Sequence, residues 1–136
     1  MPDKDFSHRS LIDKLSIKAG MRVAVLAVDD ADFLAQLAAK TGEVGKRLRA
    51  DCDVVMLGVE KTAGLDRITA CAVSIKPAGG VWVVYPKGRK DITQAQVMEA
   101  GLAAGLVDNK VCSFSATHTA LRFVVRVKDR PAGRPG

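Results

Sequence analysis

The chain has 136 residues and a mass of 14.4 kDa, which is enough for one domain with a buried core. No apolar run approaches the roughly 20 residues of a transmembrane helix, and the first residues lack an apolar leader, so we expect a cytoplasmic protein that does not enter the membrane. The net charge of +6 suggests a nucleic-acid partner, but half of the excess lies in residues 126–136.

The three cysteines, Cys52, Cys71 and Cys112, are widely spaced and odd in number. This spacing predicts neither a zinc site nor a disulfide framework, and we expect reduced, buried thiols and no metal. Residues 1–9 are polar, and residues 128–136 are basic and rich in Pro and Gly, so both segments are expected to be flexible. A single α/β domain is predicted over residues 10–127.

The first half of this domain predicts two buried parallel strands, because residues 21–28 and 53–59 are nearly continuous apolar runs. A short helix capped by Ser10 precedes the first strand. Asp29 or Asp30 is expected to cap a second helix that ends at Thr41 and Gly42. Residues 43–49 fit either a short edge strand or a loop. The predicted buried face of the second helix consists of Phe33, Leu34, Leu37 and Ala38.

In the second half, residues 61–75 predict a helix, 76–80 a break, and 81–85 a third strand. Thr93 and Gln96 form a capping box for a helix over 94–104. The runs 106–113 and 119–127 are joined by a link short enough for an antiparallel hairpin. The side chains expected to face inward from the two helices are Leu65, Ile68, Ala72, Val73, Val97, Met98 and Leu102; Trp82 and Phe123 are expected in the core.

This order of elements predicts a mainly parallel sheet of five or six strands, with helices on both faces and a closing antiparallel hairpin. Residues 53–57 (DVVML), 77–84 (PAGGVWVV) and 99–107 (EAGLAAGLV) resemble the second half of a Rossmann-type methyltransferase. Residues 10–26, 82–88 (WVVYPKG) and 105–126 more closely resemble a small bacterial family classed as a domain of unknown function. The resemblance implies a three-layer fold like a truncated class I methyltransferase, and it implies no particular activity.

The turn after the first strand, residues 29–33, contains no glycine. Cofactor-binding folds of this type use glycines there to bring a cofactor against the backbone. The three aspartates and Phe33 are expected to fill that space and to repel phosphate, and no acid after the second strand is placed to hold a ribose. We therefore predict no cofactor. The leading interpretation is a non-enzymatic protein that acts by contact with a protein partner or with itself.

The alternative is a small-ligand or nucleotide-type binder, or an enzyme, with a minimal pocket at the carboxyl edge of the sheet, equivalent to a degenerate S-adenosylmethionine site. No catalytic set of residues is recognisable in the sequence. His118, which lies in the predicted hairpin turn, is either a general base or an ordinary surface residue. A third hypothesis is weak nucleic-acid binding through Arg47, Arg49, the basic loop 87–90 and the C-terminal segment, although aromatic residues make up only 4%. The candidate pocket residues are Asp29, Asp30, Gly58, Tyr85, Lys87, Lys90 and His118.

Overall fold

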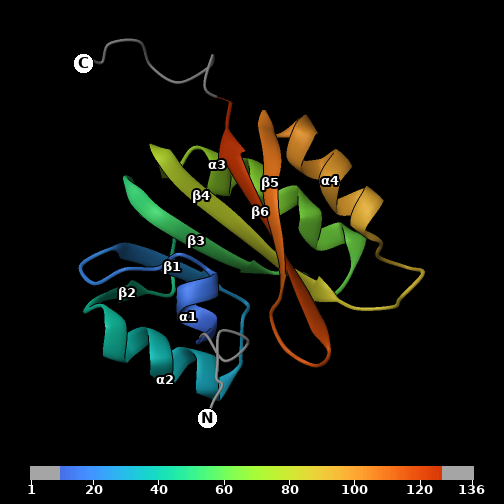
Figure 1. Cartoon of the computed structure of the whole chain (residues 1–136). Helices are drawn as coiled ribbons and strands as arrows, with labels where there is room; N and C mark the ends of the chain where they lie inside the picture. The colour runs from blue at the N-terminus through green and yellow to red at the C-terminus, as the bar shows by residue number, and fades with distance from the viewer. Residues whose placement is uncertain (1–9, 127–136) are drawn as a thin grey trace.

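The structure, a computed structural model, describes residues 10–126 (Figure 1). The predictions for residues 1–9 and 128–136 lie outside these described residues. In chain order the elements are α1 (Leu11–Lys14), β1 (Arg22–Leu26), α2 (Ala31–Lys40), β2 (Glu43–Gly45), β3 (Cys52–Gly58), the 3-10 helix η2 (Thr62–Asp66), α3 (Arg67–Ala72), β4 (Ile75–Pro86), α4 (Gln94–Ala103), β5 (Leu106–Ser113) and β6 (His118–Val125).

The strands form one six-stranded sheet in the order β2-β1-β3-β4-β6-β5. Strands β2, β1, β3 and β4 are parallel to one another, and β6 runs antiparallel to both of its neighbours, β4 and β5. The predicted mainly parallel sheet with an antiparallel C-terminal hairpin is confirmed. Residues 43–49, which fit two alternatives in the sequence, contain the short edge strand β2.

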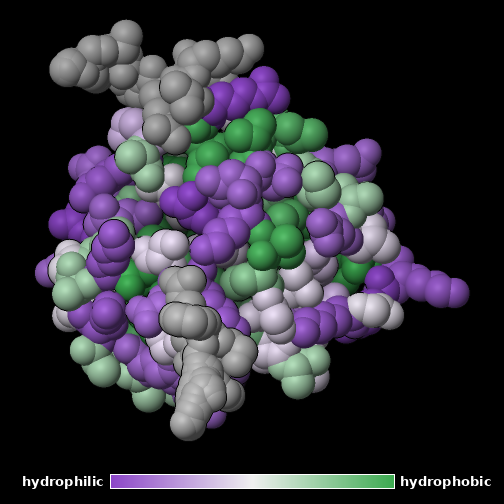
Figure 2. Space-filling view, in the orientation of Figure 1, coloured by the Kyte–Doolittle hydropathy of each residue, from purple (hydrophilic) through white to green (hydrophobic). Residues whose placement is uncertain are grey.

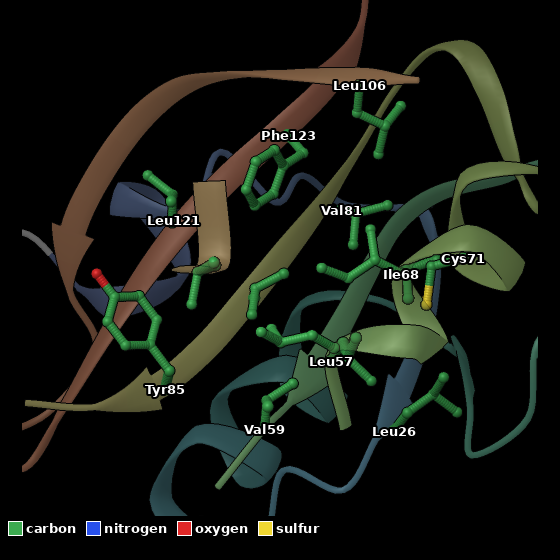
Figure 3. Close-up of a cluster of buried hydrophobic side chains, with 14 of the residues drawn as sticks. Leu26, Leu57, Val59, Ile68, Cys71, Val81, Tyr85, Leu106, Leu121 and Phe123 are labelled. Atoms are coloured by element: carbon green, nitrogen blue, oxygen red, sulfur yellow. The ribbon is translucent and has the colours of Figure 1, made fainter. Parts of the chain in front are cut away.

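Helices cover both faces of the sheet, so the domain has three layers (Figure 1). Alternate residues of β1 face opposite sides: Val23 and Val25 pack toward α1 and α2, whereas Ala24 and Leu26 pack toward α3 and α4. Figure 3 shows the second of these cores, in which Phe123 is fully buried. Trp82 is fully buried in the first core, as predicted, and its Nε1 donates to the Leu15 carbonyl at 3.1 Å.

The helix starts were predictable because they depend on local side-chain caps. Ser10 Oγ accepts from the Asp13 amide at 3.1 Å, and Asp30 Oδ1 accepts from the Phe33 amide at 2.9 Å. Thr93 and Gln96 form the expected reciprocal capping box. Within residues 10–126, no helix is both long and apolar enough to cross a membrane.

The region predicted as one helix over 61–75 is helical only over residues 62–72, and the break predicted at 76–80 is wrong. The chain forms η2 and the short helix α3 instead, and Val73 is 82% exposed. β4 already begins at Ile75 and pairs with β3 there and again from Gly80 onward, and the residues between bulge out of the ladder. Pro77, which has no N–H to donate, lies in this irregular part, so the strand continues past it.

The predicted inward faces of α2 and α4 are only partly correct. Ala38 is exposed and Leu34 is half-buried, whereas Phe33 and Leu37 are buried. In α4 the fully buried positions are Val97 and Gly101, four residues apart, and Leu102 is 49% exposed. Leu102, the largest apolar residue in the last turn of α4, points away from the sheet because the neighbouring Gly101 faces inward.

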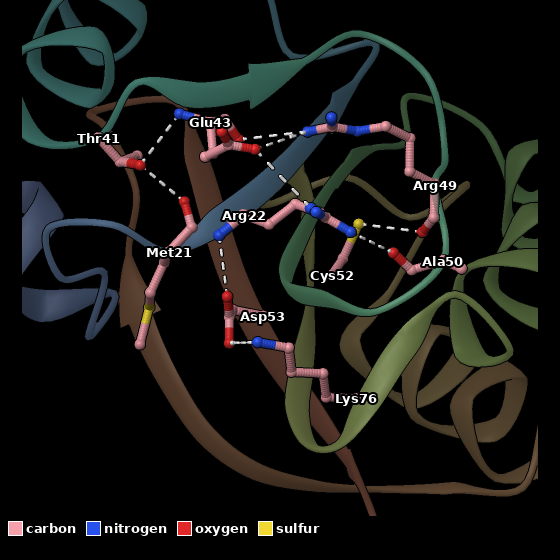
Figure 4. A network of polar contacts seen from close by, with 9 residues as sticks. All are labelled: Met21, Arg22, Thr41, Glu43, Arg49, Ala50, Cys52, Asp53 and Lys76. Carbon is pink, nitrogen blue, oxygen red and sulfur yellow. Dashed lines mark hydrogen bonds and ion pairs between the residues drawn. The ribbon is translucent and has the colours of Figure 1, made fainter.

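A polar network closes the amino edge of the sheet (Figure 4). Asp53 Oδ2 accepts from the Arg22 amide at 2.8 Å, and Asp53 Oδ1 lies 3.0 Å from Lys76 Nζ. Partial burial raises the pKa of the Asp53 carboxyl, but the amide of Arg22 and the ammonium of Lys76 outweigh it, so the pKa lies below its usual value. Thr41 Oγ1 donates to the Met21 carbonyl at 2.7 Å. The network thus connects β1, β3 and β4.

Candidate functional site

A cleft of about 390 Å³ lies at the carboxyl edge of the sheet, where β1 and β3 end and β6 begins. We call it the carboxyl-edge cleft. Edges of this kind are where open α/β sheets bind their ligands. The cleft is lined by Ala27, Val28, Asp29, Asp30, Gly58, Glu60, Val84, Phe114, Ser115, Thr117 and His118.

The floor of the cleft depends on a close backbone approach between β1 and β3. Ala27 has a φ of 60°, in the left-handed region that normally favours glycine. Its carbonyl lies against Gly58, where an added Cβ would overlap the carbonyl oxygen. The glycine that permits this close approach is thus on the neighbouring strand and not in the turn after β1, where the fold type predicts it.

The expectation that the turn residues fill the site is wrong for Phe33. Its side chain is 1% exposed and packs in the core beneath α2, with its ring centroid 5.1 Å from that of Phe114. Asp30 caps α2 and lines the cleft with Asp29, and Asp32 is exposed on the first turn of the helix. The side chains of the turn therefore leave the cleft open.

His118 lies on the opposite wall and connects two other polar side chains of the cleft. Its Nε2 is 2.7 Å from Glu60 Oε2, and its Nδ1 is 2.8 Å from Thr117 Oγ1. Glu60 also lies 3.8 Å from Arg89 Nη1 through its other oxygen. These contacts orient the imidazole ring. Glu60 and Thr117 were not among the predicted residues, although Glu60 follows the carboxyl end of a buried strand, which is a signal that could have identified it.

Three predicted residues do not line the cleft. Tyr85 is buried on the other face of the sheet, where burial raises the pKa of its phenol and its hydroxyl lies 3.4 Å from Gln94 Oε1. Lys87 Nζ donates to Ser113 Oγ at 2.7 Å. Lys90 is exposed in the loop after β4. The structure thus brings Asp29, Asp30, Gly58 and His118 together, and leaves the remaining three outside the lining of the cleft.

The ionisable side chains of the cleft are mainly acidic: Asp29, Asp30 and Glu60 with the single imidazole of His118. Asp30 is occupied by the helix cap, whereas Asp29 makes no hydrogen bond or ion pair with any part of the chain that the structure describes. Carboxylates at the wall of a cleft repel phosphate and attract cations and hydroxyl donors. Among residues 10–126, no group of three or more His, Cys, Asp or Glu side chains could hold a metal ion.

Comparison with solved structures identifies the class of fold. The chain is similar to an S-adenosylmethionine-dependent methyltransferase from Aquifex aeolicus, with a TM-score of 0.64 and 10% identity over 83% of this chain and 86% of the other. A TehB-like methyltransferase from Corynebacterium glutamicum gives 0.56 and 10%, over 85% of each chain. An O-methyltransferase of neocarzinostatin biosynthesis, in complex with S-adenosyl-L-homocysteine, gives 0.60 and 12%.

The chain therefore has the Rossmann-like α/β fold of these methyltransferases, and identities this low establish the fold alone. It spans about half the length of the neocarzinostatin enzyme, 49%, with 76% of its own residues aligned. Neither a protein-family model nor a curated protein sequence matches it. Membership of the bacterial domain family suggested by the sequence stays a prediction.

Proposed function

We propose that the protein binds a small nucleoside-type ligand in the carboxyl-edge cleft. The observation that supports this best is the convergence of Asp29, Gly58 and His118, which come from three elements distant in sequence, on one hollow of about 390 Å³. Small-molecule sites usually occupy roughly 300–1,000 Å³ and combine apolar walls with a few polar groups. Here the apolar part consists of Val28, Val84 and Phe114.

The charge of the cleft narrows the class of ligand. Asp29 and Glu60 disfavour phosphate groups, which argues against nucleotides. They favour a ligand with hydroxyl donors and positive charge, because a carboxylate only accepts hydrogen bonds. S-adenosylmethionine has both a ribose and a sulfonium cation, and the same neocarzinostatin enzyme has been solved with it. It is therefore the first candidate, and when bound it supplies an activated methyl group.

Two features of the chain fit such a ligand. The Asp29 carboxylate has no partner among the described residues and is able to accept from ribose hydroxyls or to pair with a cation. The opposite wall holds His118, whose ring is oriented by Glu60 and Thr117. The proposal is for binding, and none of these residues is assigned to transfer of the methyl group to an acceptor.

The test is calorimetric titration and thermal unfolding of the full chain with S-adenosylmethionine, S-adenosylhomocysteine, adenosine and ATP. A ligand at 100-fold its Kd should add about 2.7 kcal/mol to the stability. We expect S-adenosylmethionine, S-adenosylhomocysteine and adenosine to bind in the carboxyl-edge cleft, and ATP not to displace bound S-adenosylmethionine from it. Asp29→Asn should weaken the binding of S-adenosylmethionine, which carries the sulfonium charge, more than the binding of adenosine. Asp66→Asn, at an exposed position, serves as the control. Absence of saturable binding by all three of these compounds, or displacement of bound S-adenosylmethionine by ATP, would contradict the proposal.

Action through protein contact or self-association stays a prediction, and we do not propose it as a second function. The exposed large apolar side chains among the described residues lie on four separate parts of the chain: Val44, Val73, Leu102 and Val111. On the face shown in Figure 2, hydrophobic side chains form small groups separated by hydrophilic ones. The edge strand β5 has a bulge between Asp108 and Lys110, and such irregular, charged edges disfavour pairing with a second chain.

The nucleic-acid hypothesis is weakened by the contacts of its predicted residues. Lys87 is bonded to Ser113, and Arg89 forms a double contact with Asp91, at 3.0 and 2.6 Å. Arg49 Nη2 lies 4.0 Å from Glu43 Oε1. Arg49, Lys87 and Arg89 thus already have polar partners within the protein, whereas the Arg47 side chain pairs with no residue that the structure describes.

A further inference from the structure

A second hollow, of about 320 Å³, differs from the cleft in both position and charge. We call it the basic hollow. Leu26, which lines it, belongs to the core beneath α3 and α4, whereas Val84 and Phe114 of the carboxyl-edge cleft belong to the core beneath α1 and α2. The two hollows therefore lie on opposite faces of the sheet. The basic hollow is lined by Leu26, Lys46, Arg47, Leu48, Arg67 and Ala70.

Three cations converge on this hollow from two different segments. Lys46 and Arg47 come from the loop between β2 and β3, and Arg67 begins α3. No acidic residue lines the hollow. The side chains of these three cations make no hydrogen bond or ion pair with residues that the structure describes.

The cations of the amino edge provide the contrast. Arg22 and Arg49 each lie within 4.0 Å of Glu43, and Lys76 lies 3.0 Å from Asp53. There the fold surrounds each positive charge with an acid or a carbonyl, as Figure 4 shows. In the basic hollow it brings like charges together without a counter-charge, and like charges in proximity destabilise the folded chain. The arrangement is therefore one that an anion would stabilise.

The shape and floor of the hollow indicate what kind of anion. The two guanidinium groups each present a planar set of N–H donors that matches the oxygens of a phosphate. Leu26 is 7% exposed, and the half-buried Leu48 packs against the same core, so the floor is apolar. An apolar floor suits an organic group attached to the phosphate, because apolar surface of that group can be buried against it.

We propose that the basic hollow is a binding site for a small organic phosphate, held by Arg47 and Arg67 with Lys46 at the rim. This site is independent of the proposed function, because it lies on the other face of the sheet and selects the opposite charge. An acidic cleft and a basic hollow on one small domain would give it two ligands of different chemistry.

The experiment is calorimetric titration of the full chain with pyrophosphate and with AMP, at low and at high salt. Both probes are expected to bind saturably, with an affinity that falls as salt increases. Arg47→Ala combined with Arg67→Ala should weaken binding at least tenfold. The conservative pair Arg47→Lys and Arg67→Lys should restore part of it, because charge remains while the paired donors are lost. All of these side chains are exposed, and thermal unfolding checks that each variant is folded.

The matched control removes the same charge elsewhere, through Lys18→Ala with Lys40→Ala, both exposed. We expect this control to bind both probes as the original chain does. Equal weakening by the two double variants would overturn the proposal, because the effect would then be one of total charge. Absence of saturable binding at millimolar probe would also overturn it. Tighter binding of a single-stranded oligonucleotide than of either probe, lost in the Arg47 and Arg67 variant, would replace the small phosphate with a nucleic acid.

Discussion

The ring of Phe123 on β6 lies directly against the backbone of Gly101 in α4, and a Cβ built on Gly101 would overlap the edge of that ring. Both residues are buried, Phe123 completely. This contact determines which face of α4 meets the sheet, and it holds the helix close to β6.

Gly101→Ala is expected to destabilise the protein by about 1–3 kcal/mol through overpacking. Alanine gains about 1 kcal/mol in helix propensity over glycine, which offsets the loss only in part. Leu102→Ala, at the exposed neighbouring position, should change the stability by less than about 0.5 kcal/mol. Urea unfolding followed by circular dichroism measures both, and a stability loss larger for Leu102→Ala than for Gly101→Ala would show that the packing is wrong.

Asp53 should make the stability sensitive to acid. The pKa of its carboxyl is lower in the folded chain than in the unfolded chain. The carboxylate therefore contributes fully to the free energy of unfolding above the unfolded pKa of about 3.9, and this contribution is lost as the pH falls through the folded pKa. Asp53→Asn should cost about 1 kcal/mol at pH 7 and should reduce the loss of stability between pH 5 and pH 3. Urea midpoints at the three pH values test this. An unchanged acid dependence in the variant would argue against the contact with Arg22 and Lys76.

Cys71 should be unreactive in the folded protein. Burial raises the pKa of its thiol to about 11, against a weaker opposing effect of Arg67, so at pH 8 only about one thiol in a thousand is ionised. Labelling with a disulfide reagent, followed by mass spectrometry, should modify Cys71 only after unfolding. Rapid labelling of Cys71 at pH 8 under native conditions would contradict its placement in the core.

Trp82 is the single tryptophan of the chain and is fully buried, so its emission should be blue-shifted and should report unfolding. Its Nε1 donates to the Leu15 carbonyl and so attaches the end of α1 to the sheet. Trp82→Phe should cost about 1–3 kcal/mol, because a buried carbonyl loses its donor. Heat and urea unfolding measure the loss. A red-shifted native emission would show that α1 does not cover Trp82.

Much of the architecture could be predicted from local patterns. The apolar run of β3, the caps at Ser10, Asp30 and Thr93, and the short link of the closing hairpin each involve residues close together in the chain. Such patterns can be recognised in a sequence because both partners of the interaction lie close together in it. A capping side chain, for example, accepts a hydrogen bond from the amide three residues further on. The fold class followed from the order of these elements.

The exact inward face of a helix and the candidate site were decided by contacts between distant residues. The orientation of α4 depends on a ring from β6, and the shape of the cleft depends on Ala27 meeting Gly58 across two strands. Glu60 and His118 become partners only because β3 ends and β6 begins at the same edge of the sheet. The sequence specifies which side chains are present, but the arrangement of the strands decides which of them come into contact. The acidic cleft and the basic hollow are therefore properties of the tertiary structure.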